Sequence, residues 1–566
     1  MRIFYKMRYI RIQLLIALAG LGLVGVLLFL QSQGLVTTVV AAQGGTHTEA
    51  VVGFVDKVNP LLDGGSPVDR DLDKLIFSGL MRFDDNGLPI PDLAEAWAVS
   101  ADGLTYTFVL RNGLQWHDGQ PVTENDVLFT IGLMQAPEFP GAQDVANLWR
   151  KIQVSAPAPR TVQFILSEPF APFLDYTTVG LLPEHILRGV AAKDLPTHPF
   201  NREPIGTGAM RLTRLESKGG AVTAAQLEPF SANAGHPYYL SQVLLRFFPD
   251  EASAYQAFAK GEVLGISQFT PETFSLAFKN PNALIYSSRL PQYTMIFLNH
   301  KSQTVTHFQD KKVRQAMLAA LNRQLMVDTL LQGQALVATG PILPGTWAYN
   351  NNLIPVSYDP SRADQLLTDA GWAKPTQGTP GTPDYARTKS RKPFTFTLLA
   401  PNDPTHAAVA KWVTDNWAQL GIQAKVDLKP IAEIRNALNA RQFDAALIDL
   451  TFANSPDPDP YPFWHQTQIE SGQNFSGFDS RNMSEILEQA RVTPSYADRA
   501  KFYRSFQTQF VDQTPAILLY YPVFNYAVDK KVRGVQLGPL VDRSDRFNNL
   551  YDWYIITRRV ISNTQP

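Results

Sequence analysis

The spacing of apolar residues along the chain predicts strands and helices that alternate. In "TYTFVL", Tyr106, Phe108 and Leu110 recur at every second position, which is the period of a half-buried strand. In "DKKVRQAMLAALNRQLMVDTLLQG", residues 310–333, apolar residues recur at helical spacing up to a glycine. Further strands are expected at 292–300, 394–400 and 422–430, and further helices at 71–83, 361–372, 405–421 and 431–440. This alternation predicts α/β lobes with mixed sheets.

A basic segment followed by a long apolar run stands at the N-terminus. Arg2, Lys6, Arg8 and Arg11 precede the run, which extends from Ile12 to Leu30 with one polar interruption. At about 1.5 Å per residue such a helix spans roughly 28 Å, close to the hydrocarbon core of a bilayer at about 30 Å. Basic residues on one side of the run favour keeping that end in the cytoplasm. We therefore expect the bulk of the chain outside the cytoplasm.

The same segment has an alternative interpretation as a cleaved signal peptide. Small residues in "VVAAQ" offer a cleavage position after Ala42. The apolar run is longer than the 7–15 residues usual in signal peptides, which favours a retained anchor. Both interpretations export the rest of the chain. Residues 1–46 are assigned to this anchor or signal and its linker.

Composition removes several classes of protein from consideration. The chain has 566 residues, of which 45% are hydrophobic, so more than one compact lobe is expected. The formal net charge of -1 offers no basic field for nucleic acid. The sequence has no cysteine, which excludes disulfides, thiolate metal sites and cysteine nucleophiles. The sequence shows no nucleophile elbow, zinc-protease motif or phosphate-binding loop, and no paired histidine spacing, so no enzyme activity, metal or cofactor is expected.

One compact cluster has two interpretations, a catalytic site or a part of the scaffold. It consists of Trp116, His117 and Asp118. Asp118-Gly119 is a turn sequence, and Trp116 suits a core position. A catalytic histidine needs a nucleophile or metal partner within hydrogen-bond reach, and the neighbouring sequence supplies neither. We therefore expect a scaffold. Thr123 is expected to cap the helix that follows, with Asp126 completing a capping box.

Two loops carry the candidate ligand contacts. "FANSPDPDPYPFWHQTQ" presents Asp457, Asp459 and Trp464 on a backbone stiffened by prolines. "PILPGTWAYN" presents Trp347 and Tyr349, because aromatic side chains in loops can line an extended cleft. The aromatic segment "YYPVFNYAV", residues 520–528, fits either a cleft or an ordinary core strand. The alternative for the acidic loop is a proline-stiffened surface turn.

The sequence resembles the family 5 extracytoplasmic solute-binding proteins of peptide- and nickel-type ABC importers. The resemblance covers nearly the whole chain after the N-terminal segment. The segment that carries it best is "PDLAEAWAVSADGLTYTFVLRNGLQWHDGQPVTENDVLFT", residues 91–130. Supporting segments follow in the family's order: "PIGTGAMRL", "YTMIFLNHK", "DKKVRQAMLAALNR", "PILPGTWAYN", "ADQLLTDAGW" and "SPDPDPYPFWH", then "NFSGF" with Asn474.

The resemblance implies a two-lobed periplasmic-binding-protein-like fold of type II with the ligand between the lobes. Lobe I is expected at 47–291, including a β-rich subdomain at about 90–200, lobe II at 292–521, and a return to lobe I at 522–566. Two crossover strands forming the hinge are expected near Gln292–Asn299 and Ile517–Tyr526. The opening signature belongs to the β-rich subdomain and not to the ligand site.

The resemblance also implies a function and marks one departure from it. Related members bind peptides, nickel chelates, haem or oligosaccharides and pass them to a membrane permease with its ATPase. In peptide-binding members an aspartate three residues before an acidic-proline pair of the proline loop grips the ligand's amine. Here Asn454 and Pro456 stand three residues before Asp457-Pro458 and Asp459-Pro460.

A peptide-binding receptor is therefore expected, with Trp347, Tyr349, Asp457, Asp459, Trp464 and Asn474 as candidate contacts. The protein is expected to be a monomer at the outer face of the cell membrane, anchored by its N-terminal helix, or periplasmic or secreted if that helix is cleaved. The alternatives are a receptor for a non-peptide solute such as a metal chelate or oligosaccharide, a membrane-tethered sensor and an exported hydrolase.

Overall fold

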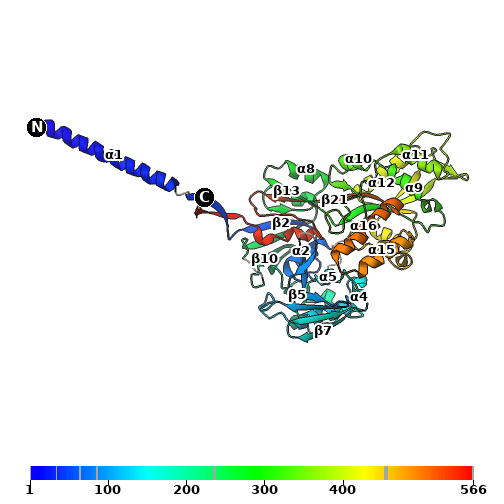
Figure 1. Cartoon of the computed structure of the whole chain (residues 1–566), viewed down its shortest axis with the longest axis horizontal. Helices are drawn as coiled ribbons and strands as arrows, with labels where there is room; N and C mark the ends of the chain where they lie inside the picture. The colour runs from blue at the N-terminus through cyan, green and yellow to red at the C-terminus, as the bar shows by residue number, and fades with distance from the viewer. Residues whose placement is uncertain are drawn as a thin grey trace.

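The protein consists of two lobes and an N-terminal helix that stands away from them (Figure 1). The computed structural model describes residues 2–32, 35–62, 66–84, 87–233, 237–451 and 457–563. A mixed sheet of twelve strands runs through both lobes in the order β19-β18-β20-β14-β21-β12-β2-β11-β10-β9, with β13 and β15 also paired to β21. The mixed α/β, two-lobed fold expected from the sequence is confirmed.

Lobe I is built on one end of this sheet. Its strands are β2 (Thr46–Val52), β9 (Met210–Lys218), β10 (Ala221–Pro229), β11 (Gln242–Phe248), β12 (Gly265–Ile266) and β13 (Ala283–Arg289), with the short pair β3 (Met81–Phe83) and β4 (Pro89–Pro91). Its helices are α2 (Pro67–Ile76), α7 (Glu251–Ala259) and α8 (Pro271–Lys279).

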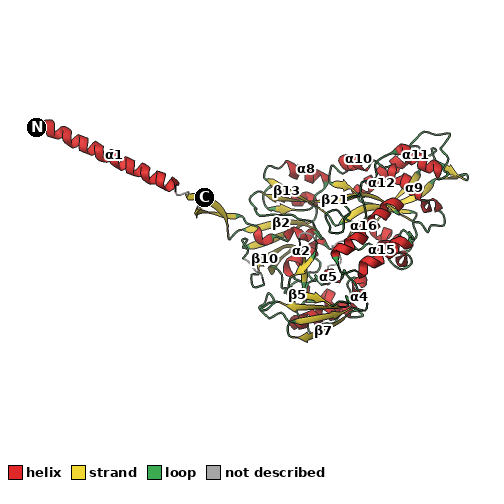
Figure 2. Ribbon diagram, viewed as in Figure 1, coloured by secondary structure: helices red, strands yellow, loops and turns green. Residues whose placement is uncertain are grey.

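The β-rich subdomain of lobe I is a separate sheet of four strands (Figure 2). The strands β5 (Ala94–Val99), β6 (Thr105–Leu110), β8 (Thr161–Ile165) and β7 (Gln153–Ala158) pair in that order, and the subdomain's helices are α3 (Glu124–Gln135), α4 (Gln143–Trp149), α5 (Phe173–Tyr176) and α6 (Glu184–Leu187). In β6 the residues Tyr106, Phe108 and Leu110 are buried, as their alternation predicts. The expected capping box is also present, since the Thr123 backbone N–H donates to Asp126 Oδ2 at 2.8 Å.

Lobe II is a sheet covered by helices on both faces. Its strands are β14 (Gln292–Leu298), β15 (Ala335–Val337), β18 (Thr395–Pro401), β19 (Gln423–Lys429) and β20 (Ala445–Thr451), with the short pair β16 (Thr388–Lys389) and β17 (Lys392–Pro393). Its helices are α9 (Lys311–Ala319), α10 (Arg323–Leu325), α11 (Pro360–Asp369), α12 (Pro404–Ala418), α13 (Ile431–Asn439), α14 (Tyr461–Trp464), α15 (Arg481–Val492) and α16 (Tyr496–Gln513). Along β14, Met295 and Phe297 pack into one apolar core and Ile296 and Leu298 into the other.

The strand β21 (Ala516–Asp529) belongs to both lobes. Its first part pairs with β14, up to Thr294 opposite Tyr520, and its last part pairs with β13, starting with Arg289 opposite Val523. The other crossing is the Leu290–Pro291 step between β13 and β14. It lies just before the expected Gln292–Asn299, because β14 pairs with β20 along its whole length and so lies inside lobe II.

Two helices differ from their sequence-based expectations. The helix expected at 71–83 is α2, which begins at Pro67 because the Ser66 side chain caps the Asp69 N–H, and which ends at Ile76. The long helix expected at 310–333 stops at Ala319, and a short π-helical turn follows α10. The buried Arg323 donates to the carbonyl oxygens of three residues from separate segments, Ala338, Val356 and Leu518, and these bonds fix the chain after the break.

The helix α1 (Arg2–Ser32) is joined to lobe I through a two-stranded ribbon (Figure 1). The ribbon consists of β1 (Leu35–Ala42) and the C-terminal strand β22 (Ile556–Asn563), which pair antiparallel along their full length. The large apolar side chains of α1 that the structure describes, between residues 13 and 29, are exposed. Among the described residues, no helix is both long and apolar enough to cross a membrane.

His117 is part of the scaffold of lobe I. Its Nδ1 accepts a hydrogen bond from the Gly206 N–H at 3.3 Å, and its Nε2 donates to the Gly208 carbonyl at 3.1 Å. Burial lowers the pKa of His117 to about 4, although the Gly208 carbonyl and Asp118 oppose the shift and Arg211 adds to it. The neutral imidazole therefore holds the glycine turn at 206–208 against the β-rich subdomain, as the scaffold interpretation expects.

This arrangement predicts that His117 makes the protein less stable in acid. The unfolded chain takes up a proton at this side chain below about pH 6.5 while the folded protein does so only near pH 4, so stability falls as the pH falls between these values. Between pH 7 and 4.5, the loss of unfolding free energy should be about 2–3 kcal/mol smaller in His117→Gln than in the unsubstituted protein. Urea unfolding at both pH values measures this difference, and equal losses would contradict the prediction.

Candidate functional site

Two cavities adjoin each other, one where the lobes meet and one within lobe I. The first, here called the hinge cavity, has a volume of about 410 Å³ and is lined by segments of both lobes. Its lining comes from residues 287–291 at the first crossing, Leu336 of β15, residues 341–346, Pro458, Val523 of β21 and residues 537–541. The second, here called the lobe I cavity, has a volume of about 1680 Å³ and shares Val541 with the first. Together they offer room for an extended ligand.

The loop at 341–346 is held in place by the crossing strand β21. The Tyr521 hydroxyl donates to the Gly340 carbonyl at 2.6 Å and accepts from the Gly340 N–H at 3.1 Å. Because Tyr521 sits at the centre of the crossing, the position of this cavity wall is tied directly to the hinge. The aromatic segment at 520–528 is therefore mainly core, with Tyr520, Tyr521, Phe524 and Tyr526 all buried.

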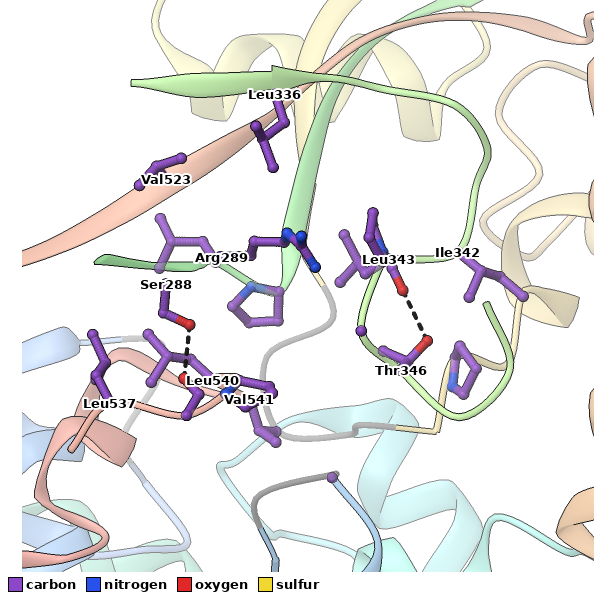
Figure 3. Close-up of a pocket in the computed structure, with 18 of the residues that line it drawn as sticks. Ser288, Arg289, Leu336, Ile342, Leu343, Thr346, Val523, Leu537, Leu540 and Val541 are labelled. Carbon is purple, nitrogen blue, oxygen red and sulfur yellow. Dashed lines mark hydrogen bonds between the residues drawn. The ribbon is translucent and has the colours of Figure 1, made fainter. Parts of the chain in front are cut away.

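The hinge cavity is apolar apart from one arginine (Figure 3). Among the described lining residues, Arg289 is the only one with a charged side chain. Figure 3 shows its guanidinium reaching from the end of β13 toward the loop that carries Leu343. Gly345 in this loop has a φ of +90°, and a Cβ there would lie 3.2 Å from Arg289 Nη1, so glycine leaves room for the guanidinium.

The lobe I cavity has a mixed lining in which charged side chains stand among apolar and neutral polar ones. Basic and acidic side chains pair along its wall, with Arg70 next to Asp542 at 2.9 Å and Lys74 next to Asp545 at 2.9 Å. Such a wide polar space suits water-mediated contacts with a ligand of variable sequence.

The proline loop of lobe II is held by two internal ion pairs. Asp457 forms an ion pair with Arg499 and accepts a hydrogen bond from the Tyr503 hydroxyl at 3.2 Å. Burial raises the pKa of the Asp457 carboxyl even though Arg499 opposes the shift. Asp459 pairs with Arg491 at 2.7 Å. Both acids are thus engaged within lobe II, and the residue between them, Pro458, reaches the hinge cavity.

The other four expected contacts lie around this loop and the loop at 341–350. Trp464 is fully buried against Phe297 and Phe510, and Asn474 is fully buried with its amide donating to the His465 and Phe478 carbonyls. Trp347 and Tyr349 are half-buried. None of the six side chains, Trp347, Tyr349, Asp457, Asp459, Trp464 and Asn474, is among the described residues that line the two cavities. Their contact with a ligand stays a prediction.

Trp347 nevertheless connects the two loops. Its ring lies 5.0 Å from the Arg499 guanidinium and packs edge-on against Tyr496. Tyr349 accepts or donates a hydrogen bond at 2.7 Å to Thr339. Trp347 and Tyr349 therefore pack next to the walls of the hinge cavity without lining it.

Lobe I and lobe II touch at a second place away from the hinge, here called the closure contact. The Asp457 backbone N–H donates to Asp175 Oδ2 in α5 at 2.8 Å, and the Ala171 N–H donates to the Arg491 carbonyl at 2.9 Å. The Arg491 guanidinium lies over the rings of both Tyr461, at 3.9 Å, and Phe170 of lobe I, at 5.4 Å. The proline loop thus meets the β-rich subdomain directly.

Arg289 was not among the residues singled out in the sequence. The usable signal was its place: in "SRLPQ" a basic residue stands two positions before a proline and just before the first expected crossover strand. The partners Arg491 and Arg499 were also missed, because they lie 32 and 42 residues from the acids they bind.

Comparison with known proteins gives a consistent family. A family model described as "Bacterial extracellular solute-binding proteins, family 5 Middle" matches residues 89–471. The oligopeptide-binding protein AppA of Bacillus subtilis is 27% identical over 520 residues, which cover 91% of this chain and 92% of that protein. The dipeptide-binding protein of Escherichia coli is 25% identical over 80% of this chain and 84% of its own length.

Solved structures agree with this assignment. The structure of Bacillus subtilis AppA in complex with a nonapeptide superposes with a TM-score of 0.70 at 25% identity, covering 91% of this chain and all of the other. NikZ from Campylobacter jejuni in complex with Ni(L-His) gives a TM-score of 0.71 at 26% identity, covering 90% of this chain and 99% of the other. On the match of the family model and the shared fold, the chain belongs to the bacterial extracellular solute-binding proteins of family 5.

Proposed function

We propose that the protein is the extracytoplasmic receptor of an ABC importer and that it binds peptides between its lobes for delivery to a membrane permease. The observation that carries the proposal is the hinge cavity, which both lobes line and which adjoins the lobe I cavity, in a chain of this family. Relatives named as oligopeptide- and dipeptide-binding proteins match over most of their length, which favours a peptide as the ligand.

The mechanism is closure of the lobes around the ligand. The two crossings at Leu290–Pro291 and Tyr521–Pro522 form the hinge, and the closure contact brings the proline loop onto the β-rich subdomain. A ligand that touches both lobes stabilises the closed form only. Moving an equilibrium from 1:99 to 99:1 takes about 5.5 kcal/mol of differential binding. The closed receptor then presents a composite surface of both lobes to the permease.

A metal chelate is the second candidate ligand, favoured by the likeness to NikZ in complex with Ni(L-His). The described residues include no group of three or more histidine and acidic side chains placed to hold a metal ion. A chelate would therefore have to be recognised through its organic part. The proline loop gives little support to the alternative of an exported hydrolase, because Asp457 and Asp459 both form ion pairs with arginines.

We also propose that the N-terminal segment attaches the protein to the outer face of the cell membrane. The support for this attachment is the basic residues followed by the apolar run of 12–30, together with the exposed apolar side chains of α1. The ribbon supports retention of this segment. Cleavage after Ala42 would remove the whole of β1 and leave β22 without the strand to which it is paired.

Peptide binding is expected at 1:1 stoichiometry without turnover. Isothermal titration of the protein with a mixture of defined peptides should show saturable binding, and mass spectrometry should recover the peptides unaltered. In the variant Leu343→Trp, the larger ring fills part of the hinge cavity and should weaken binding at least tenfold, with a loss of stability of about 1–3 kcal/mol that a thermal melt measures separately. Absence of peptide binding in the unsubstituted protein, or release of cleaved products, would contradict the proposal.

The closure contact is expected to set the balance between open and closed forms. Asp175→Ala removes the acceptor of the Asp457 N–H, a bond worth about 1–3 kcal/mol, so the ratio of closed to open molecules should fall by about fivefold or more. Asp175→Asn keeps a side-chain oxygen in the same place and serves as the control. Small-angle scattering with and without peptide measures the closed fraction. Identical scattering of the alanine and asparagine variants would show that this contact does not govern closure.

Retention of the N-terminal segment is tested by the mass of the protein isolated from its own membrane. The full chain should be found in the membrane fraction with its N-terminal residues present, and a form lacking residues 1–34 but exported by another signal should be released. A mature N-terminus at Gln43 would show that β1 is removed and that attachment does not occur through this helix.

A further inference from the structure

We propose that lobe I has a lipid-binding surface: a basic patch at the root of the ribbon binds the headgroups of anionic lipids and places lobe I against the membrane. The inference rests on the proposed attachment through the N-terminal segment and identifies the part of lobe I that faces the bilayer. It is carried by basic side chains without carboxylate partners that lie beside exposed apolar ones. The basic patch consists of Lys260, Lys279, Lys530, Lys531, Arg533, Arg558 and Arg559.

The register of the lobe I sheet brings the ribbon and the end of β21 to the same side. The strand β2 begins at Thr46, shortly after β1 ends at Ala42. Glu49 of β2 lies opposite Gly265 of β12, and Gly265 lies opposite Val528 of β21. The end of β21 is therefore level with the start of β2, which is where the ribbon joins lobe I (Figure 1).

The loops at this end of the sheet supply five of the basic side chains. Lys260 follows α7 in the loop that leads to β12. Lys279 ends α8 before the loop that leads to β13, and β13 begins opposite the last residue of β21. Lys530, Lys531 and Arg533 lie in the turn that follows β21. Positions that are far apart in the sequence thus meet at one end of the sheet.

The turn after β21 is fixed to the root of the ribbon. The Arg533 N–H donates to the Tyr554 carbonyl at 2.9 Å, and the Tyr554 N–H donates to the Arg533 carbonyl at 3.0 Å. The ribbon strand β22 begins just after this bridge, at Ile556, and carries Arg558 and Arg559. The basic positions of lobe I therefore continue directly onto the ribbon.

The positive charge of this patch is not balanced locally. All seven basic side chains are exposed, and none has an ion-pair partner among the described residues. Of the nearby acids, Glu262 pairs with Arg246 at 3.4 Å, and Asp552 lines the lobe I cavity. Asp529 accepts the backbone N–H of Lys531. Because the whole chain has a net charge of -1, this concentration of charge is a local feature.

The helix dipole explains only a part of the patch. Lys260 and Lys279 lie at the C-terminal ends of α7 and α8, where a basic side chain stabilises a helix. The three basic residues of the turn after β21 and the two of the ribbon lie at no helix end. Their charge is therefore available for a partner outside the chain.

Exposed apolar side chains lie beside the basic ones. Phe278, which directly precedes Lys279, is 71% exposed, and Leu284 near the start of β13 is 45% exposed. On the ribbon, Val39 is 55% and Ile556 is 44% exposed. Large exposed apolar side chains among charged ones are typical of surfaces that bind a membrane or another protein. The partner of this patch should therefore offer both negative charge and an apolar region.

A bilayer that contains anionic lipid offers both. Lysine and arginine side chains near such a surface are attracted by the headgroups, and apolar side chains enter the boundary between headgroups and acyl chains. A soluble polyanion would pair with the charges and leave Phe278 and Leu284 in water. An upright ribbon would keep lobe I away from the headgroups, so in the docked state the ribbon lies along the membrane with Arg558 and Arg559 against it.

The test uses the full chain with a single fluorophore. The chain has no cysteine, so Asn282→Cys, at an exposed position in the loop between α8 and β13, gives one labelling site for a polarity-sensitive dye. The protein is reconstituted into vesicles of phosphatidylcholine alone or with about 30% phosphatidylglycerol, which supplies the negative charge. Phosphatidylglycerol should shift the dye emission to shorter wavelength, and about 0.5 M salt should reverse the shift by screening.

Removing charge from the patch should prevent docking. In the triple variant Lys530→Gln, Lys531→Gln and Arg533→Gln, the ratio of docked to undocked molecules on anionic vesicles should fall at least tenfold, because each basic side chain near the surface contributes to binding. These side chains are exposed and make no described ion pair, so the fold should be retained, which a thermal melt checks.

A matched control removes the same charge from lobe II. Its changes are Lys392→Gln, Arg435→Gln and Arg504→Gln, all at exposed positions away from the ribbon. The control should dock on anionic vesicles as the unsubstituted protein does. Equal loss of docking in the control and in the patch variant would overturn the proposal, because net charge and not the patch would then decide.

The remaining outcomes separate this inference from the proposed attachment. Protein that does not float with phosphatidylcholine vesicles would contradict the attachment, and with it this inference. Protein that floats with both kinds of vesicle but shows no emission shift with phosphatidylglycerol would overturn the lipid-binding surface alone. Soluble polyglutamate that produces the same shift would assign the patch to an acidic protein partner and overturn the assignment to lipid.

Discussion

The strand β21 imposes the constraint on which the rest of the molecule depends. Its first residues belong to the sheet of lobe II and its last residues to the sheet of lobe I, so both cores are built on one continuous piece of backbone. The change of partner occurs around Tyr521 and Pro522. Proline has no N–H to donate to a ladder, so the strand is easiest to bend there. Because Tyr521 also binds Gly340, a bend at this point moves the loop at 341–346, which forms one wall of the hinge cavity.

The architecture could be predicted from the sequence because it depends on local patterns. The alternation in β6, the capping box at Thr123 and Asp126, and the turn residues of the β-rich subdomain all lie within short windows. The order of segments shared with family 5 then supplied the two lobes. The interruption after α9 was missed because it depends on Arg323 binding carbonyl groups that come from distant segments.

The candidate site was predicted less completely, for a physical reason. Asp457 and Asp459 looked available in the sequence because prolines keep their backbone in a loop, but loop acids can still be neutralised by arginines from elsewhere. Arg499 and Arg491, from α16 and α15, do this here. A buried ion pair of this kind is better evidence for a fixed position than for added stability. The two acids thus hold Pro458 at the cavity and the Asp457 N–H at the closure contact.

If α1 attaches the receptor to a membrane, as proposed above, the ribbon of β1 and β22 has a mechanical consequence. Eight paired residues at about 3.3 Å each would keep lobe I roughly 26 Å from the end of α1. Two hydrogen-bonded strands resist bending more than one extended strand does. The ribbon would therefore keep lobe I near one distance from α1, whereas a single flexible strand would set only a maximum distance. Both strands lead to lobe I, and the described part of lobe II has no such connection, so a swing of lobe II relative to lobe I would neither stretch nor slacken the proposed attachment.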